Sequence, residues 1–415
     1  MNLLYKLWCR TYQLGFRIAL PFLPYREPEL LPSLENLKDY CGKKKIEKLL
    51  IVTDGGLVKA GVCAIAEQAL KNAGIEYVIY DRTVPNPTVQ NVEEARQMYL
   101  DSGAQAILAL GGGSAMDCAK AAACRIARPR TKLNHMAGVL KVWVRLPLVI
   151  AVPTTAGTGS ETTLAAVITD PKTHHKYAIM DFPLIPRVAV HDHRLTLGLP
   201  PHITSTTGMD ALVHAVEAFI GRSTTAYTRR MSIEAVRIIR KHLVVVYKDG
   251  QNAHSRQRML QAAFCAGNAF SISYVGYVHA LAHALGGRYG TPHGLANAVL
   301  LPYVLRAYGQ GAYSRLARLA IEAGVVGARS TSNNIPTHVY DIKSEKECAE
   351  EFIAWVENMN AAMGIPQVIA DLREEDIPEL VSHALREAHP LYPVPVLFGR
   401  EELTEIYKKV LKTKD

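Results

Sequence analysis

The sequence predicts an α/β N-terminal domain built on a parallel sheet, followed by an all-α C-terminal domain. From about residue 46 to residue 192, short β-branched apolar runs alternate with segments of helical periodicity, a pattern typical of parallel strands joined by crossover helices. Beyond residue 198 the long apolar segments carry helical periodicity instead, and Pro200 and Pro201 mark the change. We therefore expect an extension at 1–24, an α/β domain at 25–198 and a helical domain at 199–415.

The individual elements follow from these runs. Strands are expected at 46–54, 75–81, 104–113, 146–155 and 187–192. Helices are expected between them at 62–74, about 91–102 and 118–127, and then at 208–220, 229–247, 255–270 and 296–308. The order of the first group is that of an α/β domain of the nucleotide-binding type.

Composition excludes several classes of protein. The chain has 415 residues, 49% of them hydrophobic, which is enough for two cores and argues against disorder. Its net charge of +9 is spread thinly, with no basic run interleaved with aromatic residues, so no nucleic-acid partner is expected. Seven scattered cysteines without a CxxC pair indicate reduced thiols and a cytoplasmic location. No apolar stretch is long enough to span a membrane.

Residues 1–24 have the pattern of an amphipathic helix that contains Lys6, Arg10 and Arg17 but no acidic residue. The charges interrupt any long apolar core, which disfavours a secretory signal. A helix lying in a membrane interface is an alternative. We favour a helix that packs on the protein or on a partner subunit.

Two glycine- and hydroxyl-rich stretches follow predicted strands. "GGGSAMD", Gly111 to Asp117, opens a helix, where backbone N–H groups can approach a phosphate. "PTTAGTGSE", Pro153 to Glu161, follows the next strand and supplies several hydroxyls. Both would meet at one crevice, which favours a ligand with a diphosphate and a Rossmann-like, dinucleotide-binding domain. Asp54 could bind a ribose and so favour NAD over NADP, or it could merely cap a turn before Gly55.

A metal site is indicated by histidines at helical spacing. Asp210 and His214 are four residues apart and leave one face of a helix. His279 and His283 have the same spacing, and His293 stands in a loop or at a helix start. One carboxylate with several imidazoles suits iron or zinc better than magnesium. A single histidine on an apolar face is more often a structural core residue, but this grouping favours ligands.

The motifs "PNPT", "GGGSAMDCAK", "PTTAGTGSE", "GMDALVHAVEAF" and "GYVHALAHALGGRYGTPHGLANAVLLP" resemble the iron-containing (group III) alcohol dehydrogenases, the family of lactaldehyde reductase and 1,3-propanediol dehydrogenase. The resemblance runs from about residue 46 to the C-terminus. It implies a metal-dependent oxidoreductase that interconverts a primary or secondary alcohol and its aldehyde or ketone by hydride transfer with NAD, using Fe2+ or, alternatively, Zn2+. Small alcohols or aldehydes as substrates and a homodimer or larger oligomer are further implications.

The resemblance also implies roles for individual residues. The metal ligands would be Asp210, His214, His279 and His293. His283 would be a catalytic proton relay, with a supporting or core histidine as the alternative. Residues that hold NAD would be Asp54, Asn86, Gly112, Gly113, Ser114, Asp117, Thr154, Thr155, Thr158, Lys176 and Thr196. The substrate pocket would include Phe270, Ile272 and Tyr274.

The chain departs from the family's pattern just before the third ligand. "AFSISYVGYVH" places Ile272, Tyr274 and Tyr277 where asparagine or small residues are usual, which puts the substrate in question. Two alternatives to the alcohol dehydrogenase remain. One is a zinc-dependent relative of the glycerol dehydrogenase or dehydroquinate synthase type, and the other is a non-catalytic, membrane-associated protein that binds NAD and metal.

Overall fold

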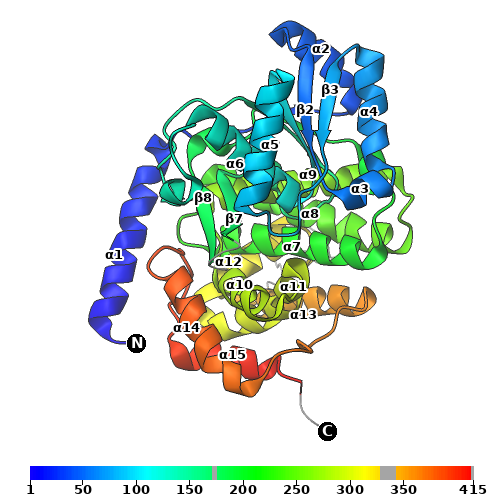
Figure 1. Ribbon diagram of the computed structural model, residues 1–415. Helices are drawn as coiled ribbons and strands as arrows, with labels where there is room; N and C mark the ends of the chain where they lie inside the picture. The colour runs from blue at the N-terminus through cyan, green and yellow to red at the C-terminus, as the bar shows by residue number, and fades with distance from the viewer. Residues whose placement is uncertain (171–174, 328–342, 413–415) are drawn as a thin grey trace. The chain divides into compact units, whose positions relative to one another are not determined.

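The computed structural model describes residues 1–170, 175–327 and 343–412, and the chain divides into two compact units (Figure 1). The α/β unit comprises Pro24–Pro200 and Asp249–Ser271, and the helical unit comprises Met1–Leu23, Pro201–Lys248 and Ile272–Asp415. The predicted fold class is confirmed. The domain boundaries expected from the sequence stay predictions, and the segment 249–271 groups with the α/β unit.

The α/β unit is built on a six-stranded sheet in the order β1-β9-β6-β4-β2-β3, in which every strand pair is parallel. Its strands are β1 (Glu29–Leu31), β2 (Lys48–Val52), β3 (Glu76–Tyr80), β4 (Ala106–Gly111), β6 (Leu148–Pro153) and β9 (Val188–Val190). Five of them lie within the predicted runs. Strand β1 was not predicted because it has only three residues and no periodic pattern, and it pairs with β9 at the sheet's edge.

Both faces of this sheet are buried, as a parallel sheet requires. Alternate residues of β2 enter opposite apolar clusters: Leu50 and Val52 on one side, Leu49 and Ile51 on the other. The helices of this unit are α2 (Leu37–Lys44), α3 (Gly55–Lys59), α4 (Val62–Ala73), α5 (Val89–Ser102), α6 (Gly113–Ala127) and most of α9 (Ala253–Ser273). Helix α6 packs in the first cluster and α4 in the second.

A second, three-stranded sheet in this unit was not predicted. It has the order β5-β8-β7, with β5 (Gly138–Val139), β7 (Ala165–Asp170) and β8 (His175–Met180). Strands β7 and β8 pair in antiparallel register, with Thr169 opposite Lys176. Their sequences mix polar and apolar residues without a long buried run, so they lack the signal that marks the main sheet.

The helical unit confirms the predicted all-α organisation of the C-terminal part. It contains α1 (Leu3–Ala19), α7 (Pro201–Ile220), α8 (Ala226–Lys248), α10 (Tyr277–Tyr289), α11 (His293–Tyr308), α12 (Gln310–Glu322), α13 (Glu345–Ala362), α14 (Ile377–Ala388) and α15 (Arg400–Lys409). The C-terminal half of α7, from Gly208 to Ile220, is buried on all sides, so its polar residues stand in a nearly dry environment. In the described ranges, no helix combines the length and hydropathy needed to cross a bilayer.

Candidate metal and cofactor sites

Three helices of the helical unit bring Asp210, His214, His279 and His293 together. Asp210 and His214 come from α7, His279 from α10, and His293 is the first residue of α11. One side-chain donor atom from each lies within 4.8 Å of the others. The Oδ1 atom of Asp210 is 3.3 Å from His293 Nε2 and 3.9 Å from His279 Nε2. The structure thus assembles residues that are up to 83 positions apart between 210 and 293.

Two further residues hold this cluster in place. Glu217 Oε2 accepts a hydrogen bond of 2.6 Å from His279 Nδ1, and its oxygens also accept from the backbone N–H groups of Gly276 and Val278. A Cβ at Gly276 would lie 2.7 Å from Glu217 Oε1, so the close approach of this backbone requires glycine. Asn297 Nδ2 donates to Asp210 Oδ1 over 2.7 Å. Both supporting side chains are buried.

Neither Glu217 nor Asn297 is among the site residues expected from the sequence, although a signal exists for each. Glu217 lies seven residues after Asp210 and three after His214, so helical spacing puts all three on one face. Asn297 follows His293 by four residues on α11. A polar residue that continues a ligand's helical face inside an apolar segment is a usable indication of a supporting role.

Burial governs the protonation of the cluster. Burial lowers the pKa of His214 to about 4, although the charge of Asp210 acts to raise it. Burial also lowers the pKa of His279 well below its usual value. Burial opposes ionisation of Asp210, but the charges of His214 and His293 hold the pKa of that carboxyl below its usual range. Burial also raises the pKa of Glu217 to about 8, partly offset by the N–H groups that it accepts from. His214 and His279 are therefore neutral and Asp210 is ionised, which are the protonation states that metal ligands need.

The donor set fits a divalent iron or zinc ion. Because the Nδ1–H of His279 is engaged by Glu217, its Nε2 carries the free lone pair, and this buried atom has no hydrogen-bond partner in the part of the chain that the structure describes. A ligand histidine whose other nitrogen donates to a carboxylate is a common arrangement at metal sites. Nitrogen donors in the majority favour iron or zinc over magnesium or calcium.

His283 lies one turn after His279 on α10 and stands at the margin of the cluster. Its ring stacks on that of His293 with centroids 5.1 Å apart, and 43% of its side chain is exposed. Its Nδ1 lies 2.6 Å from Glu387 Oε1, which also accepts a hydrogen bond from the hydroxyl of Tyr392. Burial opposes ionisation of Glu387, while the charge of His283 lowers the pKa of that carboxyl. Glu387 has no sequence signal, since it lies on α14, 104 positions from His283.

In the α/β unit the two predicted phosphate-binding loops are neighbours. Gly111 at the end of β4 pairs with Pro153 at the end of β6, and the Thr154 N–H donates to the Gly111 carbonyl over 3.1 Å. Added Cβ atoms at Gly112 and Gly113 would contact Thr155 and Thr158, respectively. The first loop opens α6, whose N-terminus favours an anion.

Other residues expected at the cofactor site surround these loops. Asn86 has a left-handed backbone with φ of 57°, donates its N–H to Ser114 Oγ and accepts from Lys176 Nζ over 3.0 Å. Thr196 is buried in the short turn that follows β9. Asp54 is the N-cap of α3, where its Oδ1 accepts from the Leu57 N–H. Asp54 therefore has the capping role considered from the sequence, and its Oδ2 atom takes no part in the hydrogen bond with Leu57.

Asp117 has contacts of a different kind. Its oxygens accept from the Ser160 hydroxyl and the Val167 N–H, and burial raises the pKa of its carboxyl to about 6. Lys120, wholly buried one turn later, donates to oxygens of Ser160 and Thr163. Together these two side chains connect α6 to the second loop, and Asp117, which is partly exposed, supports the shape of that loop.

The residues expected in the substrate pocket differ in their surroundings. Phe270 lies half-buried near the end of α9 in the α/β unit. Ile272 and Tyr274 belong to the helical unit, where the Tyr274 ring meets Phe16 of α1 edge-on at 5.1 Å. Tyr277 is fully buried, with its hydroxyl bonded to His389 and its ring stacked on Phe398. Tyr277 is therefore a core residue of the helical unit.

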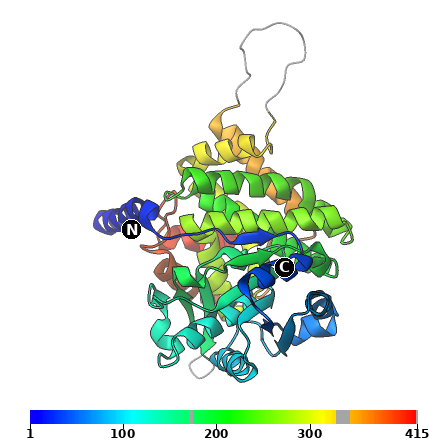
Figure 2. The same ribbon diagram turned by 90° about the horizontal axis from the view of Figure 1, so that it is seen from above.

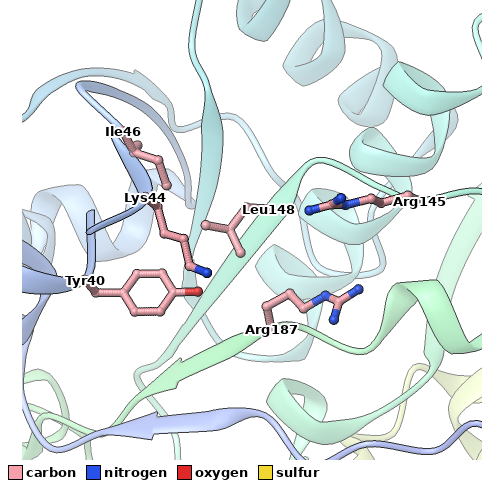
Figure 3. Close-up of a pocket in the computed structure, with 6 residues that line it drawn as sticks. All are labelled: Tyr40, Lys44, Ile46, Arg145, Leu148 and Arg187. Atoms are coloured by element: carbon pink, nitrogen blue, oxygen red, sulfur yellow. The ribbon is translucent and has the colours of Figure 1, made fainter. Parts of the chain in front are cut away.

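A hollow of about 500 Å³ lies away from these loops (Figure 3). Tyr40, Lys44, Ile46, Arg145, Leu148 and Arg187 line it. Leu148 begins β6 and Arg187 immediately precedes β9, so the hollow is at the edge of the sheet where strands begin. The predicted cofactor loops leave the opposite edge, and the hollow is not part of the candidate site.

The fold and the two sites define a nucleotide-binding, metal-dependent oxidoreductase, and comparison with known proteins identifies its family. Residues 32–193 match the model of the iron-containing alcohol dehydrogenases, and residues 204–411 match the C-terminal model of the Fe-containing alcohol dehydrogenase family. The chain belongs to the iron-containing alcohol dehydrogenase family.

Individual relatives agree with this placement. The chain is 36% identical to alcohol dehydrogenase 4 of Saccharomyces cerevisiae, with 91% of this chain and 94% of the relative covered. It is 36% identical to 1,3-propanediol dehydrogenase of Citrobacter freundii, with 88% and 91% covered. A crystal structure of 1,3-propanediol oxidoreductase superposes with a TM-score of 0.85 at 33% identity, over 94% of this chain and 99% of that one.

The protein is accordingly an NAD-dependent, iron-containing alcohol dehydrogenase that interconverts an alcohol and its aldehyde. Its placement disfavours the zinc-dependent relatives of other types and the non-catalytic binding protein considered from the sequence. Both family models together cover most of the chain, so the assignment rests on both units.

Proposed function

We propose that Asp210, His214, His279 and His293 hold one Fe2+ ion. The observation that carries this proposal is the convergence of their four donor atoms within 4.8 Å of one another, with Asp210, His214 and His279 buried and His293 partly exposed. When bound, the ion would act as a Lewis acid that favours ionisation of an alcohol hydroxyl or polarises an aldehyde carbonyl. Glu217 and Asn297 would orient His279 and Asp210 for this purpose.

His283 would relay the hydroxyl proton to solvent as hydride passes from the alcohol carbon to NAD. Its partial exposure and its hydrogen bond to Glu387 support this role, because the relay must reach both the site and water. The alternative is a supporting histidine that packs on His293. Aldehyde reduction would use the same groups in reverse.

The cofactor would be held by backbone and hydroxyl groups of the two loops. Gly112, Gly113 and Ser114 would face the diphosphate at the N-terminus of α6, and Thr154, Thr155 and Thr158 would add hydroxyls. Asn86 and Lys176, which bond each other, would add polar contacts, and Asp117 and Thr196 would complete the set. Asp54 would bind the ribose through the oxygen not used in its cap.

The substrate we propose is a small alcohol or aldehyde, with Phe270, Ile272 and Tyr274 lining the pocket. The relatives act, by their names, on 1,3-propanediol, lactaldehyde and alcohols. We further propose a cytoplasmic homo-oligomer. Seven buried cysteines that form no disulfide support a reducing compartment.

The test is anaerobic purification with Fe2+ or Zn2+, followed by metal analysis and NADH absorbance with a panel of short alcohols, diols and aldehydes. We expect about one iron per chain and turnover of at least one substrate. His279→Ala should lose both metal and rate, whereas His135→Ala, at an exposed histidine, should keep both. Full activity of His279→Ala, or no turnover with either metal, would overturn the proposal.

A further inference from the structure

Helix α1 attaches to the helical unit through one side that combines hydrogen bonds with aromatic contacts from Tyr5 and Phe16. Cys9 and Gln13 are its buried residues. The Arg10 guanidinium donates to the carbonyls of Val394 and Pro395 over 2.7 and 2.9 Å, and Gln13 Nε2 donates to the carbonyl of Tyr392 over 2.8 Å. The packing expected from the sequence is therefore present, and it uses hydrogen bonds and two ring contacts along a narrow strip of the helix.

The opposite side of α1 is apolar and exposed. The helix lies at the margin of its unit in both views (Figures 1 and 2). At 100° per residue, Leu7, Leu14 and Ile18 point away from Cys9 and Gln13. The exposed apolar face, as we call it, comprises Leu3 (80% exposed), Leu4 (77%), Leu7 (62%), Trp8 (50%), Leu14 (56%) and Ile18 (62%), with Phe22 (84%) directly after the helix. A contiguous apolar face of this kind marks an interaction site.

The charges beside this face are of one sign. Lys6 and Arg17 are exposed and fall between the exposed apolar face and the attached side. Residues 1–26 contain no acidic residue, so no acidic side chain on the helix offsets these charges. An apolar helix face bordered by basic side chains is complementary to a surface that has an anionic outer layer over an apolar interior.

We propose that α1 docks this enzyme onto the surface of an anionic lipid bilayer, lying in the plane of the interface. The exposed leucines and Ile18 enter the boundary between headgroups and acyl chains, as apolar faces of interfacial helices do. Lys6 and Arg17 contact lipid phosphates, and Trp8 and Tyr12 sit at headgroup depth. With 17 residues and interior basic groups, α1 lies on the membrane and does not cross it.

A second copy of the chain fits the face less well. Two α1 helices packed face to face would bring Lys6 and Arg17 of both copies together without an acidic partner on either helix. A coiled-coil seam through Leu3, Leu7 and Leu14 would place Arg10 and Arg17 at core positions. Charge therefore selects the lipid surface over self-association.

The experiment is co-sedimentation of the full chain with vesicles of phosphatidylcholine alone and of phosphatidylcholine with phosphatidylglycerol in a 7:3 ratio. We expect the partition coefficient to be at least roughly tenfold higher on the anionic vesicles, since each basic residue near such a surface contributes about 1 kcal/mol. Binding should weaken as the salt rises from 0.1 to ~0.5 M, because screening shortens the reach of the charges.

Variants separate the two contributions. The triple variant Leu7→Gln, Leu14→Gln, Ile18→Gln should lose roughly 100-fold in partition on anionic vesicles. The matched control, Leu100→Gln with Ile321→Gln, changes comparably exposed apolar residues elsewhere and should bind like the unchanged protein. Lys6→Gln with Arg17→Gln should lose the preference for anionic vesicles. All should keep their NADH-linked rate and melting temperature in solution.

Three results would overturn the inference. The unchanged protein could fail to sediment with anionic vesicles, or the matched control could lose as much binding as the triple variant. Light scattering could also show an assembly of the unchanged protein that the triple variant dissociates while vesicle binding is the same for both. In that third case, the exposed apolar face would be an interface between copies of this chain.

Discussion

Glu217 Oε2 on α7 and His279 Nδ1 on α10 are 2.6 Å apart, and both side chains are buried. The bond determines which nitrogen of His279 carries its proton, and leaves Nε2 facing Asp210 at 3.9 Å. A histidine in this orientation can bind a metal without first rotating or changing tautomer. The Glu217 carboxylate therefore contributes to metal affinity although it is not itself a ligand.

Glu217→Gln should therefore weaken iron binding by roughly 10- to 100-fold. The amide can no longer accept from all three N–H groups that now point at the carboxylate. Chelator competition gives the metal Kd directly. Glu234→Gln, at an exposed ion pair on α8, is the control and should leave the Kd unchanged. An unchanged Kd for Glu217→Gln in a folded protein would show that His279 is oriented by other contacts.

His283→Ala should lower kcat by roughly 100-fold while the iron content stays at the level of the unchanged protein, because a relay moves protons and does not bind metal. Glu387→Gln should lower kcat less and change the shape of its pH dependence, since the His283 ring keeps its place but loses its ionised partner. Steady-state rates across pH check both variants. A kcat within twofold of the unchanged protein would assign His283 to a packing role.

Asp54→Ser should separate the two roles of Asp54. Serine caps a helix about as well as aspartate, so the melting temperature should hold, while loss of the negative charge should raise use of NADPH relative to NADH roughly tenfold. Asp54→Ala removes both the cap of α3 and the charge and should also lose about 1 kcal/mol of stability. If cofactor preference is the same in all three proteins, Asp54 only caps the helix.

Gly159→Ala should destabilise the loop at 153–160 severely. Its φ is 58°, and an added Cβ would lie 2.7 Å from the Gly267 Cα and 2.9 Å from the Ala263 carbonyl. A left-handed backbone costs an L-residue about 1–2 kcal/mol, and the overlap adds about 1–3 kcal/mol. Gly74→Ala shares the left-handed backbone, but its added Cβ meets open space. It should therefore show only the cost of the left-handed backbone. Denaturant unfolding measures both variants.

Stability should fall in acid because of His389. Burial, with the charge of Arg10, lowers the pKa of His389 to about 4, against about 6.5 in the unfolded chain. Between these values the unfolded chain binds a proton that the folded chain does not, so stability decreases as the pH falls from 6.5 to 4, by on the order of 2 kcal/mol. His389→Gln should flatten this part of the stability profile, and an unchanged slope would place the titration elsewhere.

Local pattern determined a large share of this protein. Two-residue alternation and helical spacing reflect which faces are buried, so five strands of the main sheet, helices such as α4, α7 and α8, and the pairing of Asp210 with His214 could be predicted from neighbouring residues. Strand β1 and helices α2 and α12 to α15 were not predicted. The ends of β4 and β6 could be placed together because parallel strands end at the same edge. The small sheet of β5, β7 and β8 could not, since short strands of mixed polarity carry no period.

Tertiary structure alone decided which distant groups meet. The sequence by itself indicated helical spacing for Asp210 with His214 and for His279 with His283, and it left His293 in a loop or at a helix start. Family resemblance joined the four candidate ligands, but only packing set Glu217 against His279 and Glu387 against His283. The same holds for α1: its amphipathic pattern is local, whereas the direction of its apolar face depended on Arg10 and Gln13 finding carbonyl partners at residues 390–395. The periodicity of a sequence indicates which face of a helix or strand is apolar. Which residues contact that face is determined only when the chain has folded.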